Sequence, residues 1–287
     1  MVSEVLALLE PSRGGTFVDC TVGLGGHARA VLEAGATRLI GLDRDPEAIR
    51  RAGAALETFG AQTEVVHADY RRMAEVLDAR QVTTVEGVLV DLGVSSMQLD
   101  AADRGFSFQR DEVLDMRMDT SAGPTAAEML ADVDEQTLAD VIYEFGEERY
   151  ARRIARAIVA ARTAAPIDST GRLAEITRRA VPRRGYARID PATRTFQAVR
   201  IWVNHELDGL DVFLRQAAQR LAAGGRIVVL SFHSLEDRVV KHTFRALQAE
   251  LPPIVRVLTK RPVLPSEAEV ARNPRARSAK LRGAEAA

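Results

Sequence analysis

The sequence predicts an α/β fold of the Rossmann-like kind, with a mostly parallel sheet and an inserted all-helical domain. Three observations predict this fold. Short apolar, β-prone segments alternate with helical segments over residues 1–103, as expected for parallel strands joined by helices. The alternation stops over residues 104–195, where the apolar spacing favours helices. It returns over residues 196–287, so we expect one sheet domain whose two parts flank a helical insertion.

The first strand, its turn and the following helix are expected within residues 16–27, which read TFVDCTVGLGGH. An apolar run leads to Asp19, where the strand should end, and Gly23, Gly25 and Gly26 open the helix. Glycines let a ligand approach the backbone closely, and the free amides of a helix N-terminus favour electron-rich groups. The segment therefore predicts a site for a nucleotide-like cofactor.

Two cofactors compete for this site. Gly23, Gly25 and Ala28 match the G-x-G-x-x-G/A pattern of dinucleotide-binding proteins. Asp43 follows Gly23 by 20 residues, as the ribose-binding acid of such proteins does. However, Asp19 would repel a pyrophosphate and attract the ammonium and sulfonium groups of S-adenosylmethionine. We therefore expect S-adenosylmethionine, with NAD and a purely structural glycine turn as the alternatives.

Three further strands are expected to end beside the first. Residues 37–42 lead to Asp43, whose carboxylate can accept hydrogen bonds from both ribose hydroxyls. Residues 64–67 precede Tyr70, which can cover the adenine ring. Residues 87–90 are apolar throughout, as in a buried parallel strand. Because loops at the carboxyl ends of parallel strands form the ligand crevice, these ends predict the rest of the site.

Other polar residues near these strand ends allow more than one interpretation. Asp45 precedes a proline and is expected to be only a helix cap. Asp69 either caps a helix or accepts a hydrogen bond from the adenine amino group. The fourth strand leads into the polar loop DLGVSSMQLD at residues 91–100, which carries an acid, two serines and Gln98 to the expected reaction site.

The remaining elements follow from periodicity and from breaks at Gly123, Pro124, Pro166, Pro182 and Gly185. We expect helices over residues 3–10, 27–33, 126–130, 135–145, 148–162, 169–180 and 196–220, and strands over residues 226–231 and 255–259. Residues 273–282, NPRARSAKLR, lack an apolar period and are predicted to be irregular.

Composition excludes several classes of protein. The 287 residues are 46% hydrophobic, contain no run of 18 apolar residues and hold a single cysteine, Cys20. We therefore expect a folded, cytoplasmic protein with no membrane partner, no disulfide and no zinc site.

The net charge of −1 conceals a separation of charges. Residues 103–148 hold 13 acids and 3 arginines, whereas residues 149–200 hold 13 arginines and 3 acids, and residues 256–282 hold 8 basic residues. Either the basic segments form a phosphate-binding surface, or neighbouring acidic and basic helices neutralise each other.

The sequence resembles the RsmH (MraW) family of bacterial ribosomal RNA cytosine N4-methyltransferases, and the resemblance covers nearly the whole chain. The stretches that carry it are VDCTVGLGGH, DLGVSSMQLD, RGFSF with LDMRMD, ERYARRIARAI, PATRTFQAVRI, GGRIVVLSFHSLEDR and NPRARSAKLR. It implies a class I S-adenosylmethionine-dependent methyltransferase fold in which residues 104–195 bind the substrate. The implied partner is small ribosomal subunit RNA, with a cytidine of the decoding region as the target.

The resemblance also implies the cofactor contacts. His27 and Gln98 are inferred from it alone. A homodimer stays open, and no metal is implied. Family members usually begin with a His-x-Pro-Val segment, whereas this sequence starts at Met1. Affinity for the substrate is the property that we expect this difference to affect. The implied cofactor contacts are Gly25, Gly26, His27, Asp43, Tyr70, Asp91 and Gln98.

The expected chemistry is methyl transfer to an exocyclic amine, whose lone pair is delocalised into the cytosine ring. We expect Asp91, with Ser95 and Ser96, to accept the amine protons and aim the lone pair at the methyl group. His233 and Glu236 are expected to hold the base, although His233 as an ordinary loop histidine is the alternative. The rival functions are a methyltransferase for DNA or protein, an NAD-dependent dehydrogenase, which Asp19 and the loop after Asp91 disfavour, and a cofactor-free RNA-binding protein.

Overall fold

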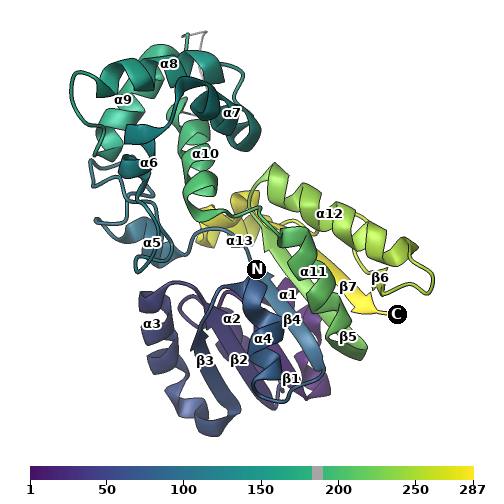
Figure 1. The fold of residues 1–287 in the computed structure, drawn as a ribbon. Helices are drawn as coiled ribbons and strands as arrows, with labels where there is room; N and C mark the ends of the chain where they lie inside the picture. The colour runs from purple at the N-terminus through teal and green to yellow at the C-terminus, as the bar shows by residue number, and fades with distance from the viewer. Residues whose placement is uncertain (183–189) are drawn as a thin grey trace. The chain divides into compact units, whose positions relative to one another are not determined.

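The structure is a computed structural model that describes residues 1–182 and 190–287. The predicted break at Gly185 and the arginines at positions 183, 184 and 188 lie outside the described residues. The chain divides into two compact units (Figure 1). Met1–Gly93 and Leu207–Ala287 form the first, here called the sheet unit, and Val94–Glu206 form the second, the helical unit.

Seven strands of the described residues form one sheet in the order β3-β2-β1-β4-β5-β7-β6. β1 to β5 pair in parallel, and β7 runs antiparallel between β5 and β6. Since the chain leaves β1 toward β2 on one side and later returns to β4 on the other, the carboxyl ends of β1 and β4 flank a ligand crevice. The strands are β1 (Thr16–Asp19), β2 (Arg38–Asp43), β3 (Thr63–His67), β4 (Val85–Asp91), β5 (Leu221–Ser231), β6 (Val255–Val257) and β7 (Lys280–Ala286).

Successive side chains of the parallel strands enter two cores, because they point to opposite faces of the sheet. On one face Val18, Ile40 and Val88 pack under α4, α11 and α12. On the other face Phe17 and Leu39 pack under α1, α2 and α3. The covering helices are α1 (Val2–Leu9), α2 (Gly26–Glu33), α3 (Pro46–Leu56), α4 (Met73–Asp78), α11 (Leu210–Gln219) and α12 (Ser234–Ala249), and α13 (Glu267–Arg272) follows β6.

The helical unit has its own core. Ile142, Ile154, Leu173 and Val199 come from four different helices and are fully buried there. Side-chain caps begin several of these helices, as when the hydroxyl of Thr125 accepts a hydrogen bond from the Glu128 N–H at 3.2 Å. The helices are α5 (Ser96–Asp100), α6 (Ala126–Asp132), α7 (Glu135–Gly146), α8 (Ala151–Arg162), α9 (Thr170–Ala180) and α10 (Ala192–Asn204).

The observed boundaries between the units differ from the predicted boundaries, which fell after residues 103 and 195. Val94 and Leu99 pack against the core of the helical unit, so this unit begins before residue 104. Phe196 and Val199 of α10 are buried in the same core, so the unit extends beyond residue 195. The alternation of elements could not show which core these side chains enter.

The single helix predicted over residues 196–220 is wrong. α10 ends at Asn204, where His205 takes a left-handed conformation with φ +50°, and α11 starts after Gly209 at φ +65°. Residues 205–209 therefore turn the chain between the two units.

The prediction that residues 273–282 are irregular is also wrong. Pro274–Ser278 form a 3-10 helix, and β7 begins at Lys280. β7 is a strand because its backbone pairs with β5 and β6 on both sides, and Leu281 and Ala284 are fully buried. Such pairing depends on distant residues and leaves little local signal.

Among the described residues, no helix combines the length and the apolarity that crossing a lipid bilayer requires.

Candidate cofactor site

Three carboxylates lie at the carboxyl ends of neighbouring strands in the sheet unit. Asp19 ends β1, Asp43 ends β2 and Asp91 ends β4. β1 lies between the other two strands, with Asp19 in register with Gly41 and Leu89. The parallel pairing thus brings together three acids that are more than 20 residues apart in sequence, as their positions at strand ends predict.

Asp19 is the most buried of the three, with 2% of its surface exposed. Its Oδ1 accepts a hydrogen bond from the Thr21 N–H at 3.2 Å, and its Oδ2 is buried without a partner among the described residues. Burial, together with the charges of Asp91 and Asp43, raises the pKa of Asp19 to about 7. The free protein therefore holds a carboxyl group that lacks a cation.

The glycine turn fixes the orientation of Asp43. The N–H of Gly23, at φ +53°, donates to Asp43 Oδ2 at 2.9 Å, and the Asp45 N–H donates to Oδ1 at 2.9 Å. Each oxygen keeps a second lone pair, so the carboxylate can still accept bonds from ribose hydroxyls. Burial raises the pKa of Asp43.

Gly25 and Gly26 leave the start of α2 without side chains. Gly25 takes φ +82°, and a Cβ there would lie 3.3 Å from Leu56 Cγ. At Gly26 a Cβ would meet no atom within 4 Å, so protein packing does not require this glycine. We expect the bare backbone at Gly26 to admit a ligand to the start of α2, and the alternative is a glycine with no such role, as at Gly53.

Replacing Gly26 with alanine should separate these two explanations. We expect the affinity for S-adenosylmethionine to fall about tenfold, because a methyl group would occupy space that the ligand needs, with the free energy of unfolding unchanged or slightly higher. Calorimetric titration and urea denaturation measure the two quantities.

Gly53→Ala in the interior of α3 is the matched control, because a Cβ there also meets no atom within 4 Å. It should raise stability by about 0.5–1 kcal/mol and leave the affinity unchanged. Equal affinities for the Gly26→Ala variant and the wild type would show that no ligand approaches Gly26.

His27 and Asp91 face each other across the crevice. His27 Nδ1 lies 3.5 Å from Asp91 Oδ2, while Asp91 Oδ1 and His27 Nε2 are buried without hydrogen-bond partners among the described residues. The Asp91 N–H donates to Thr21 Oγ1 at 2.7 Å, which ties the end of β4 to the turn after β1. Burial raises the pKa of Asp91, and His27 opposes the shift.

Thr21 contacts two of the three acids and was missed by the sequence analysis. Its N–H donates to Asp19, and its hydroxyl accepts from the Asp91 N–H. The only available signal was a hydroxyl two residues after the first acid, and many turns have that pattern.

Tyr70 follows β3 and is only 6% exposed. Its ring packs edge-to-face against Phe213, with centroids 4.7 Å apart, and burial raises the pKa of its hydroxyl. Asp69 caps the short helix that follows by accepting a bond from the Arg71 N–H at 2.9 Å. Asp45 caps α3 through the Glu47 N–H at 3.0 Å, which confirms the capping interpretation of that residue.

Ser95, Ser96 and Gln98 belong to the helical unit, whereas the three carboxylates belong to the sheet unit. Ser95 Oγ accepts from the Gln98 N–H at 3.2 Å, and Gln98 Oε1 accepts from the Ser95 N–H at 2.9 Å. This capping box starts α5 and gives both residues a structural role. Ser96 is exposed in the first turn of the same helix.

His233 and Glu236 form a capping box at the start of α12. His233 Nδ1 accepts from the Glu236 N–H at 3.4 Å, and the Glu236 carboxylate accepts from the Phe232 N–H at 2.9 Å. Both side chains are nearly buried, at 7% and 2% exposure. The cap gives both residues a structural role, while His233 Nε2 is buried without a hydrogen-bond partner among the described residues, so the binding role of the pair stays a prediction.

A cationic ligand fits this site and a pyrophosphate does not. In the described sheet unit no lysine or arginine pairs with Asp19 or Asp91, and one oxygen of each is buried without a partner. An ammonium or sulfonium group would balance these charges, whereas a diphosphate would add more negative charge. The electrostatics therefore favour S-adenosylmethionine over NAD.

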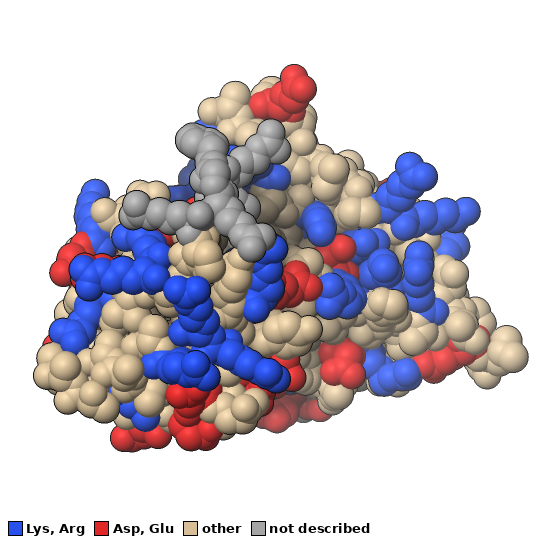
Figure 2. Space-filling view, turned by 90° about the horizontal axis from the view of Figure 1, so that it is seen from above, with Lys and Arg blue, Asp and Glu red and all other residues tan. Residues whose placement is uncertain are grey.

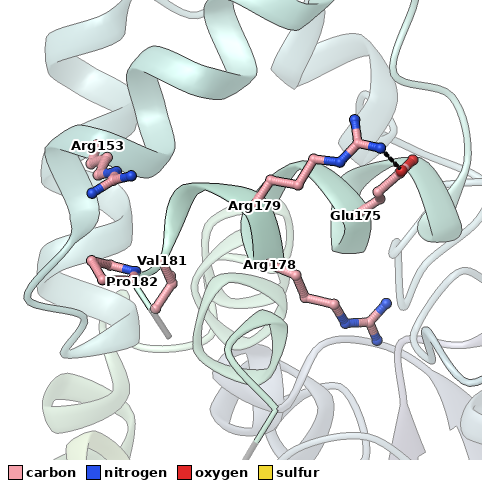
Figure 3. A pocket seen from close by; sticks show the side chains of 6 residues that line it. All are labelled: Arg153, Glu175, Arg178, Arg179, Val181 and Pro182. Atoms are coloured by element: carbon pink, nitrogen blue, oxygen red, sulfur yellow. Dashed lines mark ion pairs between the residues drawn. The ribbon is translucent and has the colours of Figure 1, made fainter. Parts of the chain in front are cut away.

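The helical unit carries a pocket of about 550 Å³ lined by Arg153, Glu175, Arg178 and Arg179 (Figure 3). Arg179 points toward Glu175 and pairs with it, while Arg178 points away and pairs with Asp190 at 2.9 Å. Arg153 comes from α8 and has no acidic partner among the described residues.

Most described arginines of residues 149–200 already have partners. Arg162 and Arg172 donate to backbone carbonyls, and Arg200 pairs with Glu206 at 2.8 Å. Neighbouring acids thus neutralise some arginines of this segment and leave others available, and phosphate binding by those others stays a prediction. Those with neither a carboxylate nor a carbonyl partner among the described residues are Arg149, Arg152 and Arg153.

The chain is similar to several known proteins. Residues 1–287 match the MraW methylase family. The chain is 52% identical to ribosomal RNA small subunit methyltransferase H of Nitratidesulfovibrio vulgaris (strain DP4), over 99% of this chain and 94% of that protein. It is 50% identical to the protein of the same name from Pelobacter propionicus, over 99% and 96%. Among solved structures, an rRNA methylase from Streptococcus thermophilus is 10% identical, with a TM-score of 0.44 over 99% of this chain and 93% of that one.

Proposed function

The chain belongs to the MraW methylase family, and from that premise we propose that it methylates the exocyclic N4 of a cytidine in the decoding region of small-subunit ribosomal RNA. The observation that carries the proposal is the cluster of three strand-end carboxylates, two of which, Asp19 and Asp91, each have a buried oxygen without a partner among the described residues. This cluster suits S-adenosylmethionine, which supplies a methyl group on a positively charged sulfur.

Residues of the sheet unit would hold the cofactor by its charged and polar groups. Asp19 presents its unpartnered Oδ2 to the ammonium group, and Asp43, fixed by two backbone N–H groups, accepts bonds from the ribose. Gly25 and Gly26 expose backbone at the start of α2. Tyr70 lies after β3, on the adenine side of the crevice.

We assign to Asp91 the role of accepting the hydrogen bond and the proton of the reacting amine. Burial raises the pKa of Asp91, and a carboxylate with a raised pKa is a better proton acceptor. A hydrogen bond from the amine to Oδ1 localises the nitrogen lone pair and orients it, which supplies the positioning that methyl transfer requires. His27 beside Oδ2 holds the carboxylate in place.

Transfer of a tritiated methyl group to purified small ribosomal subunits, with mapping of the modified nucleotide, tests the proposed function. We expect a single labelled cytidine and no label on duplex DNA or on protein. Label on DNA or protein alone would support the rival methyltransferases, and failure to bind S-adenosylmethionine in calorimetry would support a cofactor-free RNA-binding protein.

RNA binding should depend steeply on salt. An amine inside a base-paired stack is out of reach, so the base must be extruded or single-stranded and the flanking phosphates held. Each phosphate contact contributes roughly −0.7 to the slope of log K against log salt concentration. Replacing Arg152 and Arg153 with glutamine should make the slope shallower by about 1.4, measured by filter binding.

The matched control for this variant is Arg29→Gln with Arg50→Gln, which removes two arginines that already pair with Glu33 and Glu47. Its slope should equal that of the wild type. A slope near zero for the wild-type protein would contradict phosphate binding altogether.

A further inference from the structure

We propose that a second basic pocket, on the sheet unit, binds phosphate groups of the substrate RNA away from the target base. The pocket lies between the second half of α12 and the chain from β6 to residue 260, and its volume is about 200 Å³. Its cations are Lys241, Arg245 and Lys260, and we call it the α12 pocket. The proposal rests on RNA being the substrate.

The α12 pocket is separated from the cofactor site along a rigid helix. α12 begins at Ser234, at the carboxyl end of β5, and Lys241 and Arg245 follow 7 and 11 residues later. At 1.5 Å per residue, they lie roughly 10 and 16 Å from the start of the helix along its axis. The pocket is thus suited to nucleotides outside the reaction site.

All three cations are available for a ligand. Lys241, Arg245 and Lys260 have no hydrogen-bond or ion-pair partner among residues 1–182 and 190–287, and Arg245 and Lys260 are exposed. Figure 2 shows several lysine and arginine side chains over the region of α12. The fourth cation, Arg282, instead pairs with Asp237 at 2.6 Å and belongs to the supporting structure.

Acids near the pocket do not neutralise it. Asp237 pairs with Arg282, Glu250 pairs with Arg215, and Glu285 pairs with Arg226 at 2.9 Å. Each acid is thus engaged by an arginine other than the three cations of the pocket. Unpaired positive charges around a small hollow attract a polyanion without first breaking an ion pair.

Neutral donors complete the pocket. Gln248 Oε1 accepts from the Val257 N–H at 2.8 Å, which fixes the side-chain amide and leaves its two N–H donors for a ligand. Thr259 Oγ1 accepts from the Gly283 N–H at 3.1 Å, so its own hydroxyl proton is also a donor. A site that offers only donors suits the acceptor-only oxygens of a phosphodiester.

The α12 pocket can bind a phosphate at a lower energetic cost than the pocket in the helical unit. There, Arg178 and Arg179 are paired with acids, and binding a phosphate would replace an existing ion pair. In the α12 pocket no such exchange is needed. We therefore favour RNA over an acidic protein as the partner, because the same chain must already hold an RNA substrate.

The test compares two triple variants in the full-length protein. One replaces Lys241, Arg245 and Lys260 with glutamine, and its control replaces Arg29, Arg50 and Arg51, which pair with acids on α2 and α3, with glutamine. Both lose three positive charges. We expect only the pocket variant to bind small-subunit RNA about tenfold or more weakly, with a salt slope shallower by about 2.

Affinity for S-adenosylmethionine should be unchanged in both variants. A third variant, with Lys241→Arg, Arg245→Lys and Lys260→Arg, keeps the three positive charges and should bind RNA as tightly as the wild type. Equal RNA affinities and slopes for the pocket and control variants would overturn the α12 pocket while leaving methyl transfer by the wild type intact. Wild-type protein that binds the RNA without methylating it would overturn the proposed function alone. The salt slopes of the pocket and control variants would then still show whether the α12 pocket binds RNA. Tighter binding to an acidic peptide than to RNA at the pocket would also overturn the proposal.

Discussion

Asparagine at position 19 should weaken S-adenosylmethionine binding about 10- to 100-fold, which corresponds to the roughly 1.5–3 kcal/mol of a hydrogen bond to a charged group. The substitution keeps the shape of the side chain and the bond from the Thr21 N–H, but removes the negative charge that faces the ligand. Calorimetric titration at pH 8 measures the loss.

The same carboxyl group should make the wild-type affinity depend on pH. Because the pKa of Asp19 is about 7 in the free protein, the group is protonated below pH 7 and must release its proton before it pairs with a cation. Affinity should therefore fall about fivefold between pH 7 and pH 6, and about tenfold for each further pH unit. The Asp19→Asn variant should lack this dependence.

The free energy of unfolding of the ligand-free protein should fall as the pH rises, whereas the cofactor affinity should rise. Between pH 3.8 and pH 7 the unfolded chain releases the proton of Asp19 while the folded chain retains it, so this group lowers stability as the pH rises through that interval. Above pH 7 the cost reaches up to about 4 kcal/mol. The Asp19→Asn variant should therefore resist urea better than the wild type at pH 8, and the advantage should vanish near pH 4.

Asp45→Asn is the matched control, since it removes one negative charge near the same edge of the sheet and asparagine caps a helix as well as aspartate does. It should change neither the affinity nor its pH dependence. An Asp19→Asn variant that binds the cofactor as tightly as the wild type would remove the main support for a cationic ligand at this site.

Asparagine at position 91 should lower the rate of methyl transfer by roughly 10²- to 10⁴-fold, which is the usual contribution of a positioned proton acceptor. The amide keeps an acceptor oxygen but cannot take up a proton from the amine. Single-turnover transfer of tritiated methyl to small subunits measures the rate, and calorimetry measures cofactor affinity in parallel.

The two measurements distinguish a catalytic role from a binding role. Loss of turnover with cofactor affinity within about threefold of the wild type supports Asp91 as the group that meets the amine. If affinity and turnover fall by the same factor, Asp91 serves only the cofactor, and another residue must orient the amine.

The sequence predicted the carboxylate cluster of the sheet unit from the positions of its acids at strand ends. Asp19 and Asp43 were found because each stands directly after an apolar strand, and parallel strands place such positions at one edge. Ser95, Ser96 and Gln98 were grouped with Asp91 because they share its loop. That grouping could not show that a unit boundary follows Gly93, or that Ser95 and Gln98 cap α5.

The sequence by itself determined the strand, glycine turn and helix at the cofactor site, the acids at the strand ends and the helical nature of the insertion. All of these arise from residues that are adjacent or one helical turn apart. Only the tertiary structure decided that β7 pairs between β5 and β6, which arginines already pair with acids, and that Asp19 is buried enough to raise its pKa to about 7. These properties depend on contacts between residues far apart in the chain, where burial and pairing set the energy of a charge.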